Sequence, residues 1–222
     1  MFDSIAHRYD LLNRVLSLGI DVSWRKKLVS AVSSNQPQAI LDVATGTGDV
    51  ALMMVETLEP RSVIGIDIAK NMLEIGREKA IKRDLAQQIS FLIGDSENME
   101  FANNTFDAVT VAFGVRNFEH TLLGLEECYR VLKPGGRFAV LEFSKPMIVP
   151  FRQVFQLYFR YILPIIGRLT SKDPKAYHYL FESVQSFPEG KAFTDLMEKA
   201  GFLHTSFQPL TLGICTLYWG DK

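Results

Sequence analysis

The sequence has little that would support metal, redox or nucleic-acid chemistry. Its 222 residues include only two cysteines, Cys128 and Cys215, and neither has a partner at the spacing of a zinc or redox motif. The 24 basic residues nearly balance the 25 acidic ones, and no long run of like charge offers a surface for a nucleic-acid backbone. We therefore expect no metal site and no nucleic-acid partner, and a small uncharged or lipid-like substrate is easier to accommodate.

A leader and a membrane span are missing from the sequence as well. The first residues do not begin the basic, apolar and small-residue pattern of a signal sequence, and no uninterrupted apolar run reaches the roughly 18 residues that span a bilayer. We therefore predict a cytoplasmic protein. Hydrophobic residues make up 47% of the chain, which is ample for one core, so 1–222 is expected to be a single domain. Within it, we expect 1–35 to form a helical lid region and 145–190 a helical insertion on the substrate side.

Strand and helix patterns alternate along the chain, which is typical of an α/β fold. The expected strands are 39–43, 62–67, 89–93, 106–113 and 137–143, and the expected helices are 49–59, 71–83 and 121–132. The last helix should end at a turn over 133–136, which contains a proline and two glycines. Two further strands, 202–210 and 214–219, are separated by a short turn and predict a hairpin. The pattern therefore predicts a doubly wound, mostly parallel sheet that finishes with an antiparallel hairpin.

The most informative segment is 40–49, which reads ILDVATGTGD. Its apolar start predicts a buried strand, and Gly46 and Gly48 allow the backbone to turn tightly and to approach a ligand closely. Asp67 ends the next strand 21 positions after Gly46, where a carboxylate can accept hydrogen bonds from both hydroxyls of a ribose. These features predict a nucleoside-binding βαβ unit.

The same spacing satisfies the G-x-G-x-x-G/A pattern of NAD sites, so charge has to separate the two ligands. A pyrophosphate would need the helix N-terminus at Asp49, but an aspartate stands there, and Asp42 precedes the loop. Two carboxylates suit a cation, and S-adenosylmethionine brings an ammonium and a sulfonium where NAD brings phosphates. We therefore predict S-adenosylmethionine as the cofactor.

Ligands of such sheets bind at the carboxyl ends of the strands, which places Asp67, the turn at 94–96 and the segment 113–117 on one rim. Asp95 could accept a hydrogen bond from the exocyclic amine of adenine, while the backbone N–H of Ser96 binds a ring nitrogen. The alternative for Asp95 is a plain turn-forming role after a glycine.

Two longer segments are more specific than the glycine loop. The run YDLLN at 9–13, with Ser17 and Trp24 after it, and the run RVLKPGGRFAVLEFS at 130–144 closely resemble the two signatures of the quinone C-methyltransferases of menaquinone and ubiquinone biosynthesis. The runs DSEN at 95–98 and FGVRN at 113–117 match too, and the resemblance extends from residue 2 to about residue 220. It implies a seven-stranded, Rossmann-like class I methyltransferase. The implied reaction is methyl transfer to a ring carbon of demethylmenaquinol, the last step of menaquinone biosynthesis, or of a ubiquinone-precursor benzoquinol.

The resemblance also implies cofactor contacts at Thr47, Asp67, Asp95, Ser96 and Ala112. Part of the family has Ser in place of Ala112, so a contact there has to use the backbone or van der Waals packing. Asp21 is a second departure, because the family usually has His at that position. With their neighbours in the loop and on the rim, the predicted cofactor residues are Asp42, Thr45, Gly46, Thr47, Gly48, Asp67, Ile68, Asp95, Ser96, Ala112 and Phe113.

The implied chemistry is an in-line displacement by a ring carbon that becomes nucleophilic when the adjacent phenol ionises. A phenol titrates near pH 10, so forming the phenolate at pH 7 needs about 4 kcal/mol of stabilisation. Arg116 follows the fourth strand at the rim and is the candidate cation, and Asn117 would orient substrate or backbone. The structural alternative for Arg116 is an ion pair with Glu119, Glu127 or Glu142.

Four aromatic or imidazole side chains are further candidates around the substrate. His7 is a possible base, because imidazole titrates near neutrality. Tyr9 could lie in a lid over the cofactor, although core packing is nearly as plausible. Tyr177 and Tyr179 share one helix and could line a quinol ring site with Arg116, and ordinary helix packing is their alternative.

Residues 151–166 are mostly apolar apart from a polar stripe at Arg152, Gln156 and Arg160. This surface could bind the isoprenoid tail, attach the protein peripherally to the inner face of the cell membrane, or form a homodimer. Two other functions remain open. One is a methyltransferase that acts on a different small molecule, and the other is a non-catalytic module that senses S-adenosylmethionine. The Arg116–Asn117 segment argues against the second.

Overall fold

The computed structural model describes most of the chain. The described residues are Arg14, Ser17, 19–146, Val149, Gln153, Leu157 and 175–222, without the side chains of Asn35, 175–178, 180 and 181. The predictions for His7, Tyr9, the Tyr177 side chain and nearly all of 151–166 therefore lie outside the described residues.

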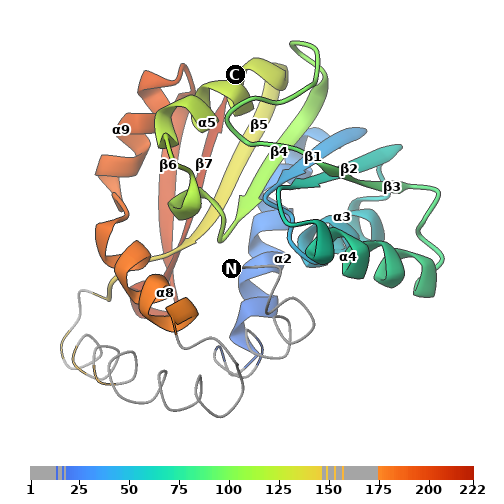
Figure 1. Cartoon of the computed structure of the whole chain (residues 1–222). Helices are drawn as coiled ribbons and strands as arrows, with labels where there is room; N and C mark the ends of the chain where they lie inside the picture. The colour runs from blue at the N-terminus through green and yellow to red at the C-terminus, as the bar shows by residue number, and fades with distance from the viewer. Residues whose placement is uncertain are drawn as a thin grey trace.

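The described strands form one sheet of seven in the order β3-β2-β1-β4-β5-β7-β6 (Figure 1). Their bounds are β1 Ala39–Val43, β2 Ser62–Asp67, β3 Ile89–Ile93, β4 Phe106–Ala112, β5 Leu132–Phe143, β6 Leu203–Leu210 and β7 Cys215–Asp221. The first five pair in parallel, and β7 runs antiparallel to both β5 and β6. The predicted fold class, a mostly parallel sheet that ends in an antiparallel hairpin, is confirmed.

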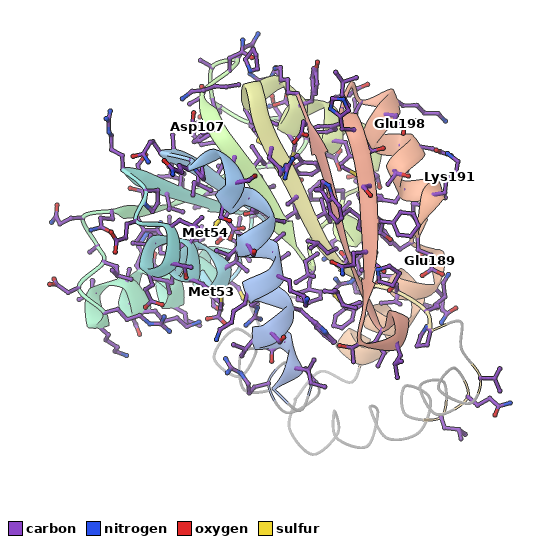
Figure 2. All side chains as sticks on the ribbon, turned by 180° about the vertical axis from the view of Figure 1, so that it is seen from behind. Met53, Met54, Asp107, Glu189, Lys191 and Glu198 are labelled. Carbon is purple, nitrogen blue, oxygen red and sulfur yellow. The ribbon has the colours of Figure 1, made fainter. Side chains whose placement is uncertain are left out.

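Helices cover both faces of the sheet. α2 (Ile20–Val32), α3 (Asp49–Leu58) and α4 (Lys70–Lys82) pack on one face, and α5 (Thr121–Val131) and α9 (Lys191–Lys199) pack on the other. Figure 2 shows the molecule from behind, so that the face with α2 and α3 is toward the viewer. Both helices lie in front of the strands, and Met53 and Met54 lie on α3. Met54 is fully buried, because its side chain is part of the hydrophobic cluster under that face. α8 (Lys175–Ser186) lies near the carboxyl end of β5 (Figure 1).

Strand β1, which lies between β2 and β4, shows why two cores form. Ile40 packs into the cluster under α2 and α3, whereas Leu41 and Val43 pack into the cluster under α5 and α9. Successive side chains of a strand point to opposite faces, so a strand covered on both faces reads as a continuous apolar run. The exception in β1 is Asp42, which is 1% exposed and therefore has to be satisfied inside the protein.

The segment 133–136 differs from the predicted turn. β5 begins at Leu132, and its register against β4 shifts between the pairs Phe106–Leu132 and Ala108–Arg137. Gly135 takes a φ of +77°, and its N–H donates to the carbonyl of Lys222 at 2.7 Å. Gly135 adopts the left-handed conformation that favours glycine, as predicted. The segment is, however, a bulge within β5 and not a turn before that strand.

Candidate cofactor and substrate site

A cavity of about 250 Å³ opens at the carboxyl ends of the parallel strands. The predicted cofactor residues that line it are Gly46, Asp67, Ile68, Asp95, Ser96, Ala112 and Phe113. The remaining predicted cofactor residues, Asp42, Thr45, Thr47 and Gly48, are not among its lining. Asn117 lines the cavity as well, so residues after β1, β2, β3 and β4 converge on one site. This arrangement is the one expected for ligands of open α/β sheets.

The glycine loop is held by the carboxylate of Asp67. Its Oδ2 accepts a hydrogen bond from the N–H of Gly46 at 2.8 Å, and its Oδ1 accepts one from the N–H of Ala69 at 2.8 Å. These two contacts orient the carboxylate. The same side chain therefore shapes the loop and lines the cavity.

Gly48 supports the loop by close packing. Its φ is +77°, and a Cβ at this position would lie 2.5 Å from the ring of Phe91. A side chain would therefore push the start of α3 away from β3. Gly48 does not contact the cavity, and its role is to let the helix approach the sheet.

Asp42 lies inside the protein, behind the cavity. Its two carboxylate oxygens accept hydrogen bonds from Thr110 Oγ1 at 2.6 Å and Thr45 Oγ1 at 2.7 Å. Burial raises the pKa of Asp42 to about 6, although both hydroxyl groups act in the opposite direction. Thr45 is therefore a partner of Asp42, and neither residue is among those that line the cavity.

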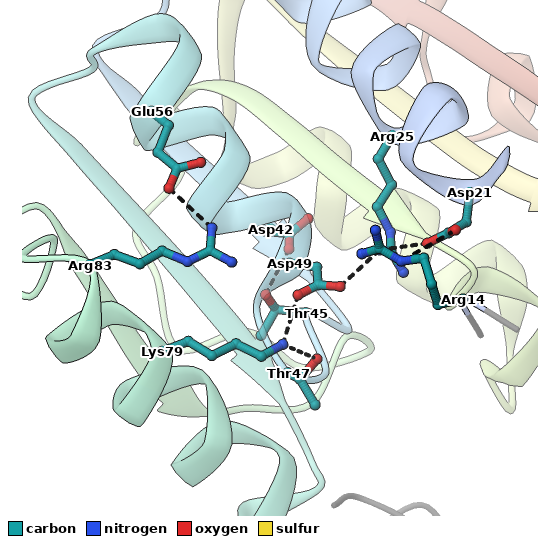
Figure 3. Close-up of polar contacts among 10 residues, drawn as sticks. All are labelled: Arg14, Asp21, Arg25, Asp42, Thr45, Thr47, Asp49, Glu56, Lys79 and Arg83. Atoms are coloured by element: carbon teal, nitrogen blue, oxygen red, sulfur yellow. Dashed lines mark hydrogen bonds and ion pairs between the residues drawn. The ribbon is translucent and has the colours of Figure 1, made fainter. Parts of the chain in front are cut away.

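Asp49 is the centre of a charge cluster (Figure 3). Its carboxylate accepts hydrogen bonds from Arg25 Nη1 at 2.8 Å and Lys79 Nζ at 2.7 Å, and Lys79 also donates to Thr47 Oγ1 at 3.0 Å. Burial raises the pKa of Asp49, but the charges of Arg25 and Lys79 outweigh it and hold the pKa below its usual value. Asp49 is thus an ionised group that two cations compensate.

The premise that Asp42 and Asp49 offer free carboxylates to the ligand is therefore wrong. Most of their partners are far away in the sequence: Thr110 is 68 positions from Asp42, and Arg25 and Lys79 are 24 and 30 positions from Asp49. The sequence shows the two acids but does not show which side chains bind them.

Asp21, where the related family usually has His, belongs to the same cluster. It is 3% exposed and forms an ion pair with Arg25 at 2.9 Å, while Ser17 Oγ donates to it at 2.7 Å. Arg25 therefore bridges Asp21 of α2 and Asp49 of α3. The cluster fixes α2 against the helix that follows the glycine loop (Figure 3).

The turn after β3 lines the cavity and is braced from two sides. Asp95 Oδ1 accepts the N–H of Glu97 at 2.9 Å, so the side chain shapes its own turn in addition to lining the site. Glu97 accepts hydrogen bonds from the backbone N–H and Nδ1 of His120 at 2.7 and 3.0 Å. Burial raises the pKa of Glu97, but the hydrogen bonds from His120 lower it by more, so the pKa lies below its usual value. Nothing in the sequence pattern predicts this contact between Glu97 and His120.

The segment after β4 is strained and tightly packed. Phe113 has a φ of +59°, a region that bulky residues rarely adopt, and its ring lies 4.6 Å from that of Phe143. A Cβ on Gly114 would lie 2.6 Å from the Cβ of Ala44. The strained backbone turns the chain at the cavity, and the aromatic contact and the close approach hold it there.

Arg116 is in an ion pair, which was the structural alternative. Its Nη1 lies 2.5 Å from Oε1 of the fully buried Glu142 and also donates to the carbonyl of Phe113 at 2.6 Å. The Arg116 side chain is 6% exposed and is not among the residues that line the cavity. Of the three predicted partners, Glu142 is therefore the one that the fold supplies. Within the described part of the chain, Arg116 Nε is buried without a hydrogen-bond partner.

Asn117 does reach the cavity, and Tyr179 of α8 contacts it. The Oη of Tyr179 donates to Asn117 Oδ1 at 3.1 Å, and Asn117 Nδ2 lies 3.5 Å from the carbonyl of Phe113. Of the predicted substrate residues whose side chains are described, Tyr179 is thus joined to the site and Arg116 is packed behind it. Met72, Glu97, Phe118 and Glu119 also line the cavity, and none of them was among the predicted site residues.

Comparisons with known proteins identify the family. The sequence matches the ubiE/COQ5 methyltransferase family over residues 1–222. The chain belongs to this family. It is 47% identical over 222 residues to the demethylmenaquinone methyltransferase of Bacteroides fragilis, covering 100% of this chain and 91% of the relative. It is 48% identical over 223 residues to the ubiquinone/menaquinone biosynthesis C-methyltransferase UbiE of Geotalea daltonii, covering 100% and 94%.

The fold is also that of solved methyltransferases. A SAM-dependent methyltransferase of Thermotoga maritima superimposes with a TM-score of 0.69 at 18% identity, over 100% of this chain and 98% of that one. As a member of the ubiE/COQ5 family, the chain is a methyltransferase that uses S-adenosylmethionine, and the predicted enzyme class and cofactor are confirmed. Among the described residues there is no cluster of three metal-binding side chains, and no helix is long and apolar enough to cross a membrane.

Proposed function

We propose that this methyltransferase converts demethylmenaquinol to menaquinol, the last step of menaquinone biosynthesis. The observation that carries the proposal is full-length identity of 47% to a demethylmenaquinone methyltransferase. The cavity supports it, because its lining includes Asp67, Asp95 and Ser96, which suit a nucleoside, together with Phe113 and Asn117, which offer an aromatic and an amide group.

The cofactor would lie along the carboxyl ends of β1, β2 and β3. Asp67 is oriented by two backbone N–H groups and would accept hydrogen bonds from the ribose hydroxyls. Ile68 is 72% exposed and lines the cavity, so it would cover the adenine ring, whose edge would face Asp95 and Ser96. An exposed apolar side chain beside a carboxylate is well suited to a ligand with one flat apolar face and one polar edge.

The reaction would be a displacement at the methyl carbon. A bond forms between a ring carbon of the quinol and the methyl group while the methyl–sulfur bond breaks, and its electron pair stays on sulfur, so that S-adenosylhomocysteine leaves. The phenol proton passes to a base or to water before attack, and the proton on the attacked ring carbon is lost afterwards. The enzyme has to stabilise the phenolate, which costs about 4 kcal/mol at pH 7 without help.

Two neighbouring residues could supply this stabilisation. Asn117 lines the cavity and can donate an N–H to the phenolate oxygen. Arg116 is not part of the cavity lining and would stabilise the phenolate through its Nε, which has no hydrogen-bond partner among the described residues. Its charge is largely compensated by Glu142, so we expect a directed N–H dipole rather than a free cation. His7, Tyr9 and Tyr177 remain proposals for a base and for substrate contacts.

A turnover assay tests the proposal. The protein is incubated with methyl-labelled S-adenosylmethionine and a panel of short-tailed quinols, and the products are identified by mass spectrometry. We expect one methyl group on a ring carbon of demethylmenaquinol. Exclusive methylation of the benzoquinol would support the ubiquinone-precursor alternative, since the name of the Geotalea relative covers both ubiquinone and menaquinone biosynthesis. Cofactor binding without any methylated quinol would contradict both and would leave a methyltransferase that acts on a different small molecule, or the sensing module.

We also propose that 151–166 contacts lipid. It would either bind the isoprenoid chain of the quinol or attach the protein peripherally to the inner face of the membrane. The support is its composition, which is apolar apart from a few polar residues. Sedimentation with vesicles that contain the quinol would show such attachment, and gel filtration would show a homodimer.

A further inference from the structure

Tyr179 and Asn117 are joined across a long separation in sequence. The hydroxyl of Tyr179 on α8 lies 3.1 Å from Oδ1 of Asn117, which is 62 positions earlier in the chain. Asn117 ends the short helix η2 (Val115–Asn117) after β4 and lines the cavity. α8 lies by the carboxyl end of β5 (Figure 1), so the bond links a helix outside the sheet to the site.

The chemistry of the neighbours fixes which way the Asn117 amide points. The carbonyl of Phe113 can only accept hydrogen bonds, so the amide group that faces it has to be Nδ2. Oδ1 then faces Tyr179, whose hydroxyl donates to it. This assignment follows from donor and acceptor types and holds whichever amide atoms are drawn as N and O.

The contact with Phe113 is too weak to hold the amide alone. The distance from Nδ2 to the carbonyl is 3.5 Å, and that carbonyl already accepts a bond from Arg116 Nη1 at 2.6 Å. The Tyr179 hydroxyl makes the shorter bond to the amide and holds the Asn117 side chain in place, while the Phe113 carbonyl selects its orientation. Without the hydroxyl, the side chain would be held only by the weaker contact and could turn away from this position.

We propose that Tyr179 is a positioning residue that acts through Asn117. Its hydroxyl holds the amide so that the second N–H of Nδ2 is available to an oxygen of the substrate. This inference rests on the proposed function, since the oxygen is that of the quinol as it becomes a phenolate. It assigns Tyr179 a role different from direct contact with the quinol ring, and it makes Asn117 the residue that touches the substrate.

A double-mutant cycle tests the inference. Tyr179→Phe keeps the ring and removes the hydroxyl, and Asn117→Ala removes the amide. We expect Tyr179→Phe to lower kcat about five- to tenfold, the effect of one oriented hydrogen bond, with little change in KM for the quinol or in Tm. Asn117→Ala should lower kcat about a hundredfold, and adding Tyr179→Phe to it should cost nothing more. Tyr129→Phe is the matched control, because that ring packs on Phe202 and Lys222, away from the site.

The possible outcomes separate the alternatives. An equal loss from Tyr179→Phe in the wild-type and Asn117→Ala backgrounds would mean that Tyr179 contacts the substrate directly, and the inference would be wrong. Wild-type kcat in Tyr179→Phe would also overturn it. The turnover of the wild-type protein on the quinol panel reports the proposed function separately, because it does not depend on either variant.

A second measurement needs no turnover. The side-chain amide signals of Asn117 in a ¹⁵N-labelled sample are identified by their loss in Asn117→Ala. Tyr179→Phe should shift them and Tyr129→Phe should leave them in place, whatever the enzyme methylates. Unchanged signals in Tyr179→Phe would show that the hydroxyl does not orient the amide.

Discussion

Arg116 and Glu142 form a buried ion pair, with 2.5 Å between Nη1 and Oε1. Glu142 is fully buried, and its second oxygen lies 3.3 Å from the backbone N–H of Arg116. The carboxylate at the end of β5 therefore holds both the side chain and the backbone of the segment after β4. A buried pair of this kind is costly to break by removing one partner, and that cost has to be separated from any role in catalysis.

Replacing Arg116 by Met should lower the free energy of unfolding by about 3 to 5 kcal/mol, because Glu142 is left buried without a counterion. The double variant Arg116→Met/Glu142→Leu removes both charges and should recover much of this loss. Urea unfolding measures both values. A double variant that is no more stable than the single one would mean that the cost lies in packing and not in charge.

The same variant also tests the catalytic proposal once activity is expressed per folded molecule. If Arg116 stabilises the phenolate, Arg116→Met should lower the single-turnover rate about a hundredfold. Its rate should then climb more steeply with pH than that of wild type, because more phenolate forms unaided as the pH approaches about 10. A normal rate in a less stable variant would remove Arg116 from the catalytic residues.

Local patterns in the sequence predicted most of the fold and half of the site. The strands and helices follow apolar periodicity, and the glycine loop with Asp67 depends on residues whose spacing is fixed by one βαβ unit. The pairings that decide what each charged residue does were not predictable. Arg116 and Glu142 are 26 positions apart, and Asn117 and Tyr179 are 62 apart. Such contacts depend on how the layers pack. The sequence could therefore name Glu142 among three candidate partners of Arg116 but could not show which of the three forms the ion pair.

Asp67→Ala should weaken binding of S-adenosylmethionine by about 2 to 4 kcal/mol, since a charged acceptor for two hydroxyls is lost. The variant should also melt earlier, because the N–H groups of Gly46 and Ala69 lose their partner. Titration calorimetry below the melting temperature measures the affinity. Asp195→Ala, which breaks an exposed pair with Lys191 on α9, is the control and should bind the cofactor normally. Wild-type affinity in Asp67→Ala would place the ribose elsewhere.

S-adenosylmethionine and S-adenosylhomocysteine should raise the melting temperature, whereas NAD and NADP should leave it unchanged. A ligand stabilises the native state only if it binds that state, and a hundredfold excess over Kd corresponds to about 2.7 kcal/mol. The test matters because Asp42 is buried against Thr110 and Asp49 is paired with Lys79, so the charge argument from the sequence no longer excludes a pyrophosphate by itself. Stabilisation by NAD would mean that the loop also accepts dinucleotides.

Gly48→Ala should destabilise the protein more than Gly135→Ala does. Both glycines have a φ of +77°, so both variants carry the same backbone strain of about 1 kcal/mol. A Cβ at Gly48 would lie 2.5 Å from the Phe91 ring, whereas nothing lies within 4 Å of one at Gly135. The clash should add about 1 to 3 kcal/mol, measured by urea unfolding. Equal losses would show that Phe91 moves aside without cost.

Asp42 should make the wild-type protein less stable as the pH rises from about 4 to 6. Its pKa is 3.8 in the unfolded chain and about 6 in the folded protein, because burial disfavours the charged carboxylate. The folded state therefore binds the proton more tightly, so this contribution to stability is complete below pH 3.8 and is lost as the pH rises through about 6. The change is at most about 3 kcal/mol. In Asp42→Asn the amide oxygen can accept a hydrogen bond from one of Thr45 and Thr110, the amide N–H can donate to the hydroxyl oxygen of the other, and this pH dependence should disappear. The difference in unfolding free energy between the two proteins, measured across this range, should therefore shift in favour of Asp42→Asn as the pH rises. A constant difference would mean that Asp42 keeps its ordinary proton affinity in spite of being buried.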